Sequence, residues 1–542
     1  MANKTLFKSL IGKLTPAANT ANEAGGAAYL RSPKAMLAQF AATGCLTDTF
    51  YASAEGQLAT VLSLCGSPAI EPEFIARTAL YARNKGHMKD LPALLCATLA
   101  VRGPGLLAEV FDRVIDDGRM LRNFVQIIRS GVTGRKSLGS LPKRLVNDWF
   151  DKRSDEAIFR ASVGNDPSLA DVIRMTHPKP ATASRAALYG YLIGQPHDAT
   201  ALPEIVKQYE AFKAGRSSEL PDVPFQMLTS LELTREHWKQ IARNGSWQMV
   251  RQNLNTFARH GVFEEGQAME RLIAEKLRDA SAIRKARVFP YQLLVAYTQA
   301  TDVPRQVREA LQDAMEIATR NVPKVDGRVI VCPDVSGSMH SPITGGRKGA
   351  TSEVRCVDVA ALVAACFLRT NPHAEVVPFK EAVVKIDLNA RDSVMTNAAK
   401  MTAIPPGGTN CSAPLAELNR RGAKGELVVF VSDNESWVDK ARNRGTATMA
   451  EWATFKARNP GAKLVCIDLQ PYSTTQADSG YPGVLNVGGF SDSVFDVIAA
   501  FVADEKATGD RWVAAIEAVS IWSKPLTGGS PRARLHASPA AW

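Results

Sequence analysis

The sequence predicts a multidomain protein with two different architectures in one chain. Residues 20–320 show apolar side chains at three- and four-residue spacing, interrupted by Gly, Pro or Asn, with almost no strand-like alternation. After residue 325 the chain instead alternates β-branched runs of strand length with helical stretches. We therefore expect an all-α helical-repeat module followed by an α/β doubly wound domain. The 542 residues are also too many for a single hydrophobic core.

The helical part divides into many short helices. Representative segments are SPKAMLAQFAATG, EPEFIARTALYARNKG and DLPALLCATLAVRG, each with apolar residues at helical spacing. A long series of such helices is typical of a solenoid built from helical pairs. The sequence shows no fixed repeat length, so any repeats are degenerate.

The second part shows the pattern of a parallel sheet covered by helices on both faces. Its strand-like runs are GRVIVCPD, EVVPF, AVVKIDL, ELVVFVSD, KLVCIDLQ and VLNVGG, and helical stretches lie between several of them. A helix over 309–320 and a linker over 321–327 are expected before the first strand. The predicted division is an N-terminal extension 1–19, a helical-repeat module 20–324, an α/β domain 325–505, and a C-terminal helix and tail 506–542.

Positive charge is concentrated in the helical part. The chain has a net charge of +11, and residues 1–325 contain 42 Lys and Arg against 32 Asp and Glu, a net charge of +10. Phosphate neutralisation supplies most non-specific affinity for nucleic acid, so this distribution suggests a polyanionic partner for the helical part.

The basic residues gather in three clusters that are candidate RNA contacts. No acidic residue lies between Asp117 and Asp148, a run that carries several Arg and Lys. The candidates in this run are Arg129, Arg135, Lys136, Lys143 and Arg144; the others are Arg174, His177 and Lys179, and then Arg251 and Asn253. Arg and Lys suit phosphate, and Asn also reads base edges. For any single residue the alternative is a solvated helix face. For His177, which precedes a proline, the alternatives are a helix cap or a core histidine.

A metal-binding motif follows the first strand of the α/β domain. GRVIVCPD runs into Asp334, Ser336 and Ser338, the loop PPGGTN offers Thr409, and the strand ELVVFVSD ends at Asp433. In open α/β sheets, ligands bind at the carboxyl ends of the strands. One site there would supply hard oxygen donors for a single divalent cation, with Mg²⁺ expected and Mn²⁺ or Ca²⁺ as alternatives. The competing interpretation is a polar β-turn at DVSGS and a helix cap at Asp433.

Other features bound the class of protein. The eight cysteines lie mostly in apolar runs without zinc-ligand spacing, which predicts buried, reduced thiols. No apolar stretch is long enough to span a membrane, and the N-terminus lacks a signal peptide, so we expect a cytoplasmic protein with no membrane partner. No P-loop, HExxH or catalytic triad is evident, and we expect no enzymatic activity.

The metal motif resembles the metal-ion-dependent adhesion site (MIDAS) of von Willebrand factor A-type domains, which have a Rossmann-like fold. That family's pattern is Asp-x-Ser-x-Ser, a Thr and an Asp, matched here by Asp334, Ser336, Ser338, Thr409 and Asp433. In the family the hydroxyls usually ligate the ion directly, and an open position takes an acidic group from a partner.

The helical part resembles the TROVE module of the Ro autoantigen family. NEAGGAAYLRSPKAMLAQFAATGCLTDTFYAS, EPEFIARTALYARNKGHMKDLPALLCATLA, LADVIRMTHPKP, PFQMLTSLELTREHWKQIARNGSWQMVRQNLNTFARHGVF and ARVFPYQLLVAYTQ are similar to successive family segments. Helical repeats followed by an A-type domain are that family's architecture. The resemblance covers about residues 20–500 and implies a HEAT-like helical ring whose two ends the A-type domain joins.

The resemblance also implies a function. The family binds small non-coding Y RNAs on the basic outer surface of the ring and takes single-stranded 3′ ends of misfolded RNAs into it. Its bacterial members are associated with 3′-to-5′ exoribonucleases such as polynucleotide phosphorylase. We therefore expect an RNA-binding protein of RNA quality control or degradation. The alternative is a metal-dependent protein-interaction scaffold whose A-type domain grips a partner's carboxylate.

Overall fold

The computed structural model describes residues 16–43, 48, 52–164, 167–264, 266–286, 288, 290–319, 322–343, 354–436, 445–470, 472–489, 492–504 and 511–522. Residues 1–15 of the predicted N-terminal extension and 523–542 of the predicted tail lie outside these ranges. None of the helices within the described ranges combines the length and the apolar character needed to cross a bilayer.

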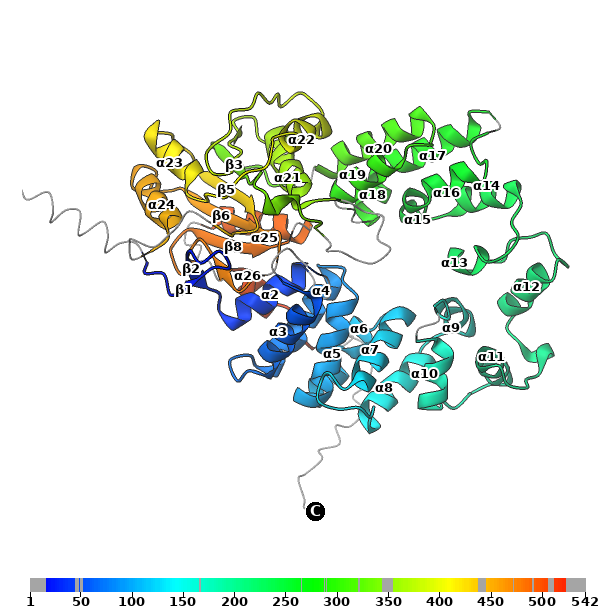
Figure 1. Ribbon diagram of the computed structural model, residues 1–542. Coiled ribbons are helices and arrows are strands. Elements are labelled where there is room, and N and C mark those ends of the chain that lie inside the picture. Colours follow the sequence, from blue (N-terminus) through cyan, green and yellow to red (C-terminus); the bar gives the residue numbers. More distant parts are fainter. Residues whose placement is uncertain are drawn as a thin grey trace, which may run out of the picture.

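The first part is helical, and its helices follow a closed path that begins and ends at the α/β domain (Figure 1). The helices are α2 (Pro33–Thr43), α3 (Ala54–Gly66), α4 (Pro72–Asn84), α5 (Asp90–Arg102), α6 (Pro104–Val114), α7 (Gly118–Ser130), α8 (Ser140–Asp151), α9 (Asp155–Ala161), α10 (Leu169–Thr176), α11 (Ala183–Ile193), η1 (Ala199–Ala201), α12 (Glu204–Lys213), α13 (Phe225–Leu228), α14 (Arg235–Asn244), α15 (Trp247–Gln252), α16 (Leu254–Arg259), α17 (Ala268–Arg278), α18 (Ala280–Ala286), α19 (Pro290–Gln299) and α20 (Arg305–Ala318).

Neighbouring helices pack mainly on one another, as in a solenoid. α4 contacts α5, α5 contacts α6 and α7, and α6 contacts α8. Local capping sets many of the helix starts: Asp117 and Ser154 each accept a backbone N–H from the first turn of the helix that follows. The predicted helix over 309–320 begins earlier, at Arg305, because Pro304 cannot donate within a helix but is well suited to precede one.

The second part is a parallel sheet with the order β4-β3-β5-β6-β8. Its elements are β3 (Val329–Pro333), η3 (Ser338–His340), α21 (Cys356–Thr370), β4 (Glu375–Val376), α22 (Val394–Thr402), α23 (Ala413–Arg420), β5 (Leu427–Ser432), α24 (Ala447–Arg458), β6 (Lys463–Asp468), β8 (Val484–Gly488), α25 (Asp492–Ala503) and α26 (Arg511–Glu517). Every pairing in this sheet is parallel, which confirms the doubly wound prediction.

Alternate residues of each strand point to opposite faces of the sheet. Val329 and Val331 of β3 join the large core that includes α21 and α25. Ile330 and Cys332 point into a second core. That core also contains residues of α23 and of the inner face of α24, including Trp452. Helices therefore cover both faces of the sheet, as expected when strands are buried on both sides.

One predicted strand is wrong. AVVKIDL, residues 382–388, forms no strand, because the chain folds back after β4 and makes only an isolated antiparallel bridge between Phe379 and Val383. Val384, Ile386 and Leu388 are instead partly buried against the large core, so the alternation of apolar residues reflects packing on that core rather than sheet pairing.

The α/β domain holds both ends of the helical path. At one end α2 contacts β8 and α26, and α4 contacts α26; at the other end α19 contacts α21, and α20 contacts α22. A small antiparallel sheet adds a third link: β1 (Thr20–Ala21) pairs with β2 (Ala27–Leu30), which pairs with β7 (Thr474–Thr475). The ring implied by the resemblance is therefore present, closed by the sheet domain (Figure 1).

The cysteines within the described residues are buried and form no disulfide, in line with the prediction of buried thiols. They are Cys65, Cys96, Cys332, Cys356, Cys366, Cys411 and Cys466. Cys45 lies outside the described residues.

Candidate metal centre and nucleic-acid interface

The two predicted acidic ligands lie side by side because they follow neighbouring parallel strands. Pro333 of β3 is paired with Val431 of β5, so Asp334 and Asp433 leave the sheet at the same edge. The Asp334 N–H donates to the carbonyl of Val431 at 3.0 Å, and the Ser432 hydroxyl donates to Asp334 Oδ2 at 2.7 Å. Both carboxylates are almost completely buried.

The Asp-x-Ser-x-Ser loop turns its hydroxyls toward these acids. The Ser336 N–H donates to Asp334 Oδ1 at 2.8 Å, and the hydroxyl oxygens of Ser336 and Ser338 are 3.5 Å apart. The Glu435 N–H donates to Asp433 Oδ1 at 3.3 Å. The other oxygen of Asp433, Oδ2, is buried and has no hydrogen-bond partner among the described residues. A buried carboxylate oxygen without a donor is what a bound cation would complete.

The loop that carries Thr409 packs on the same motif. The Gly337 N–H donates to the carbonyl of Gly407 at 2.8 Å, and Thr409 itself is buried. A Cβ added at Gly337 would lie 3.4 Å from that carbonyl oxygen, so the two loops are in van der Waals contact here. The structure thus gathers Asp334, Ser336, Ser338 and Asp433, with the loop of Thr409 beside them.

Without a cation, burial and mutual repulsion disfavour the ionised forms of Asp334 and Asp433. Burial, followed by the charge of Asp433, raises the pKa of Asp334 to about 7. Burial likewise raises the pKa of Asp433, although the Ser338 hydroxyl opposes the shift. No three His, Cys, Asp or Glu side chains converge on one point within the described ranges, so an ion here would depend on hydroxyl oxygens as well. Two carboxylates with serine hydroxyls form a hard-oxygen donor set that fits Mg²⁺.

The raised pKa of Asp334 predicts the pH dependence of metal binding. The pKa of Asp334 in the folded protein, about 7, lies above its usual value of 3.8, so protons compete with a cation for this carboxylate below pH 7. Without a cation, the contribution of Asp334 to the stability of the fold is lost as the pH rises from about 4 to 7. We expect the apparent affinity for Mg²⁺ to rise about tenfold between pH 6 and pH 8, as the ionised fraction rises from about one tenth to nine tenths, and then to level off. Calorimetry at the two pH values measures this, and equal affinities would contradict it.

Three charged residues beside the metal motif were not among the sequence predictions. Asp468 ends β6, Glu435 lies two residues after Asp433, and Arg31 comes from the N-terminal segment. Arg31 forms a buried ion pair with Asp468. Burial, Asp433 and Asp468 raise the pKa of Glu435 to about 8. An acid at the carboxyl end of a strand was a usable signal for Asp468; nothing local in the sequence places Arg31 here.

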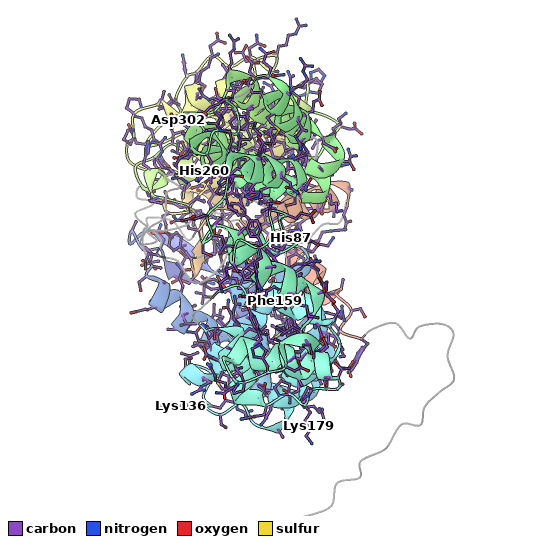
Figure 2. The ribbon with its side chains drawn as sticks, turned by 90° about the vertical axis from the view of Figure 1, so that its right-hand side faces the viewer. His87, Lys136, Phe159, Lys179, His260 and Asp302 are labelled. Atoms are coloured by element: carbon purple, nitrogen blue, oxygen red, sulfur yellow. The ribbon has the colours of Figure 1, made fainter. Side chains whose placement is uncertain are left out.

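The first two basic clusters lie on adjacent elements. The Arg129 guanidinium contacts the sulfur of Met175, which links α7 to α10, and Asn147 Nδ2 donates to the carbonyl of Thr176 at 3.3 Å, which links α8 to α10. Figure 2 shows Lys136 and Lys179 at the same end of the molecule. We name the basic surface as the exposed residues Arg129, Lys136, Arg144, Arg174, His177 and Lys179, with Lys143 half-buried among them.

His177 caps a helix rather than filling the core. It is exposed, has a left-handed φ of 50°, and ends α10, with its N–H donating to the carbonyl of Ile173. Of the two interpretations left open by the sequence, the helix cap is therefore correct.

Two candidate RNA contacts have structural roles instead. Arg251 is buried, and its guanidinium donates to the carbonyl of Gln292 at 2.8 Å, so its expected surface contact is wrong: a helix pattern alone does not show which face meets a neighbouring helix. Arg135 is half-buried and donates to the carbonyls of Ser137 at 2.9 Å and Ala100 at 3.3 Å, which fixes its own loop.

Asn253 lies at the junction of α15 and α16, away from the basic surface. It is half-buried, and its Nδ2 donates to the carbonyl of Met249 at 2.8 Å. Figure 2 shows His260, which follows α16, far from Lys136 and Lys179. The third cluster is thus separate from the first two.

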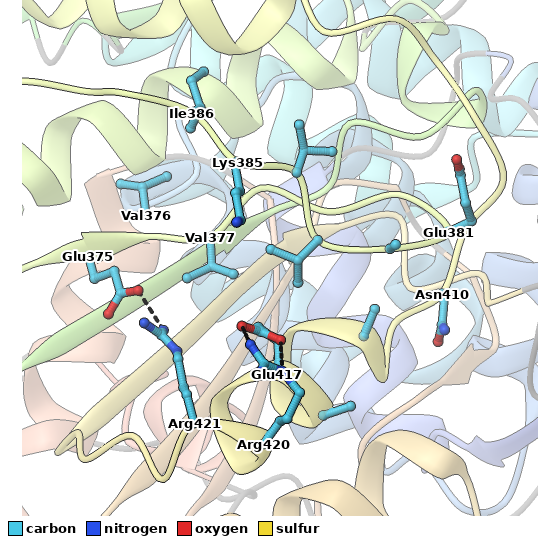
Figure 3. Close-up of a pocket in the computed structure, with 15 residues that line it drawn as sticks. Glu375, Val376, Val377, Glu381, Lys385, Ile386, Asn410, Glu417, Arg420 and Arg421 are labelled. Atoms are coloured by element: carbon cyan, nitrogen blue, oxygen red, sulfur yellow. Dashed lines mark hydrogen bonds and ion pairs between the residues drawn. The ribbon is translucent and has the colours of Figure 1, made fainter.

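A cavity of about 800 Å³ lies beside the edge strand β4 (Figure 3). Its walls come from β4, residues 381–386 and α23. Four of its charged groups form two ion pairs: Arg420 donates to both oxygens of Glu417 at 2.7 Å, and Arg421 pairs with Glu375. The lining also contains Glu381 and Lys385, which carry opposite charges. The acidic and basic side chains of the lining balance, so the cavity is not preorganised for a strongly charged ligand.

Comparison with known proteins identifies both parts of the chain. Residues 136–331 match the TROVE domain model, and residues 328–502 match the Ro60 vWA domain model. The RNA-binding protein RO60 of Deinococcus radiodurans is 26% identical over 523 residues, 89% of this chain and 95% of the relative. The RNA-binding protein RO60 of Caenorhabditis elegans is 23% identical over 321 residues, 54% of this chain and 47% of the relative.

A solved structure shows the same fold. The crystal structure of the Deinococcus radiodurans Ro (Rsr) protein superposes with a TM-score of 0.61 at 21% identity, covering 88% of this chain and 100% of that one. The two domain models together span residues 136–502 in the order that the structure shows, a helical ring followed by the sheet domain that closes it. The chain therefore belongs to the Ro60 family, with a bacterial relative that matches it along nearly its whole length.

Proposed function

We propose that this protein binds RNA through the basic surface of its helical part and has no catalytic role. The observation that carries the proposal is the surface itself, where exposed Arg and Lys side chains from α7, α8 and the segment after α10 gather beside one another. The two relatives named above are called RNA-binding proteins, which supports the same partner. Clustered cations neutralise backbone phosphates and so bind nucleic acid with little dependence on its sequence.

The finer proposal concerns the kind of RNA. A small structured RNA of the Y type would lie on the basic surface, and misfolded RNAs with a single-stranded 3′ end would be the other class of ligand. The protein would act in the cytoplasm in RNA quality control or degradation, beside a 3′-to-5′ exoribonuclease such as polynucleotide phosphorylase. The resemblance to the Ro family supports these assignments.

The metal motif is proposed to serve a different partner. Asp334, Ser336, Ser338, Thr409 and Asp433 would hold one divalent cation, expected to be Mg²⁺, and the cation would offer a carboxylate of a protein partner a coordination position. The unpartnered Oδ2 of Asp433 supports this, as does the hard-oxygen character of the donors. A metal-dependent scaffold for protein contacts is thus a second activity for the same chain.

The basic surface is tested by charge removal. Replacing Lys136, Arg144 and Lys179 with Ala is expected to weaken binding of a small structured RNA and to reduce the slope of log affinity against log salt by about one unit per lost phosphate contact, about three in all. A gel-shift or filter-binding titration at several salt concentrations measures both quantities. All three side chains are exposed, so the fold should be unaffected.

The matched control removes the same charge elsewhere. Lys385, Arg391 and Lys424 are exposed residues of the α/β domain, and replacing all three with Ala should leave both affinity and salt slope close to the wild-type values. If the two triple variants behave alike, the effect is one of net charge and the basic surface is not the binding site.

A further inference from the structure

The loop that carries Asp433 also holds the N-terminal end of the helical path. Glu435 follows Asp433 by two residues and accepts the N–H of Glu23 at 3.0 Å. The carbonyl of the next residue, Ser436, accepts a hydrogen bond from Asn22 Nδ2 at 2.9 Å. A candidate metal ligand and two contacts to the N-terminal segment therefore lie within one short stretch of chain.

The loop of the two serines is linked to the same end by a second route. The Ser338 carbonyl accepts the N–H of Ser341 at 3.0 Å, and the Ser341 hydroxyl accepts a hydrogen bond from Gln470 Nε2 at 3.2 Å. The Gln470 carbonyl in turn accepts a hydrogen bond from Gln39 Nε2 of α2 at 2.6 Å. Both loops that bear candidate ligands are thus connected by hydrogen bonds to the helical part.

The residues that make these contacts are almost completely buried. They are Asn22, Gln39, Glu435, Ser436 and Gln470. A hydrogen bond broken at such a place leaves a buried polar group without a partner unless the whole junction opens to water, which is costly. The docked N-terminal end therefore favours one position of each metal-binding loop over others.

The other end of the helical path joins the sheet domain far from the metal motif, at α21 and α22 (Figure 1). There Asn371 Nδ2 donates to the carbonyl of Pro323 at 3.2 Å, and Asn371 Oδ1 accepts the N–H of Val325 at 2.9 Å. Asn22 is bonded in a similar way, since its Oδ1 accepts the N–H of Gly26 at 2.7 Å. α21 begins beside the serine loop, and its 15 residues span about 22 Å, so Asn371 at its far end is a matched position away from the motif.

We propose that Asn22 and Gln39 are positioning residues of the metal centre: by docking on the sheet domain, the N-terminal end of the helical ring holds the two ligand-bearing loops in the arrangement that binds the cation. The inference rests on the proposed metal site and extends it to two residues outside the ligand set. Coupling between two binding events is reciprocal, so cation binding stabilises the docked segment by the same factor by which docking strengthens cation binding.

The test compares two asparagine variants in the full chain. Asn22→Ala removes a buried asparagine at the junction beside the motif, and Asn371→Ala removes one at the other junction. Calorimetric titration with MgCl₂ measures the affinity. We expect Asn22→Ala to bind Mg²⁺ about fivefold more weakly than the wild type, at the low end of the usual coupling between linked sites. Asn371→Ala should bind Mg²⁺ as the wild type does, whereas a general loss of stability would affect both variants alike.

Hydrogen exchange supplies the reciprocal measurement. Saturating Mg²⁺ should slow amide exchange in residues 20–31 of the wild type by about fivefold, and it should have no effect there in Asp334→Ala, which lacks a candidate ligand. Equal Mg²⁺ affinities of Asn22→Ala and Asn371→Ala would overturn the inference while the metal site stands, and so would exchange in residues 20–31 that does not respond to Mg²⁺. If the wild type binds no Mg²⁺, the proposed metal site fails together with the inference.

Discussion

Replacing Arg31 with Met is expected to lower the free energy of unfolding by about 3–5 kcal/mol, the cost of removing one partner from a buried ion pair. The side chain of Arg31 is 3% exposed and that of its partner Asp468 is fully buried. Met fills a similar volume, so the loss comes from Asp468, whose pKa burial already raises to about 7 and which would stay buried without its counter-charge. Glu435 and Asp433 lie close enough to repel it further.

The expected effect extends to ring closure because Arg31 belongs to the segment that joins the N-terminal end of the path to the sheet domain. In the same segment Asn22 Nδ2 donates to the carbonyl of Ser436 at 2.9 Å, and Glu435 accepts the N–H of Glu23 at 3.0 Å. Gln39 donates to the carbonyl of Gln470 at 2.6 Å. Loss of the ion pair should therefore also increase hydrogen exchange in residues 20–31 and in β7.

Urea denaturation measures the stability change. The control is Arg305→Met, since Arg305 pairs with Glu309 at the surface with its side chain 92% exposed, where an ion pair contributes little. The double variant Arg31→Met/Asp468→Asn should recover part of the loss because no buried charge is left unpaired. A loss no larger than that of Arg305→Met would show that Arg31 does not hold the ring closed.

Replacing Asp334 with Ala is expected to abolish Mg²⁺ and Mn²⁺ binding, with a loss of affinity greater than about a hundredfold, because a buried carboxylate ligand and the acceptor of two hydrogen bonds disappear together. The far-UV circular dichroism should change little, since the variant removes a carboxyl group whose pKa is raised to about 7 by burial and then by the charge of Asp433, so the fold loses no favourable ionised group. Calorimetric titration of the purified chain measures the affinity.

The control for this variant is Asp387→Ala, which removes an exposed acid of the same domain outside the motif. It should bind the cation as the wild type does. Retained affinity in Asp334→Ala would show that the buried acids are a structural cluster and that the cation, if any, binds elsewhere.

The sequence predicted the parts of this protein that depend on local pattern. Asp334 and Asp433 each follow a strand of the parallel sheet. Because the carboxyl ends of neighbouring parallel strands meet at the same edge, the two acids lie there however the helices pack. The helical part followed from its 3.6-residue period in the same way. The alternation of apolar residues in 382–388 led to a wrong strand prediction. An extended segment buries every second side chain on any apolar surface, and here that surface is the large core rather than a neighbouring strand.

The features that the sequence did not predict arise from long-range packing. Arg31 and Asp468 are 437 positions apart, and no local signal relates them. Arg251 belongs to a basic cluster in the sequence, but in the fold its guanidinium donates a hydrogen bond to the carbonyl of Gln292.

The division of labour between the two parts is the central claim, and one measurement tests it most directly: the affinity of Asp334→Ala for a small structured RNA, compared with that of the wild type at the same salt and Mg²⁺ concentrations. The helical part carries almost all of the net charge, and many phosphate contacts outweigh a single cation. The account predicts affinities within about threefold of each other, well under 1 kcal/mol. A loss of more than about tenfold, with circular dichroism unchanged, would mean that the metal itself contacts RNA and would contradict the assignment of RNA to the helical ring.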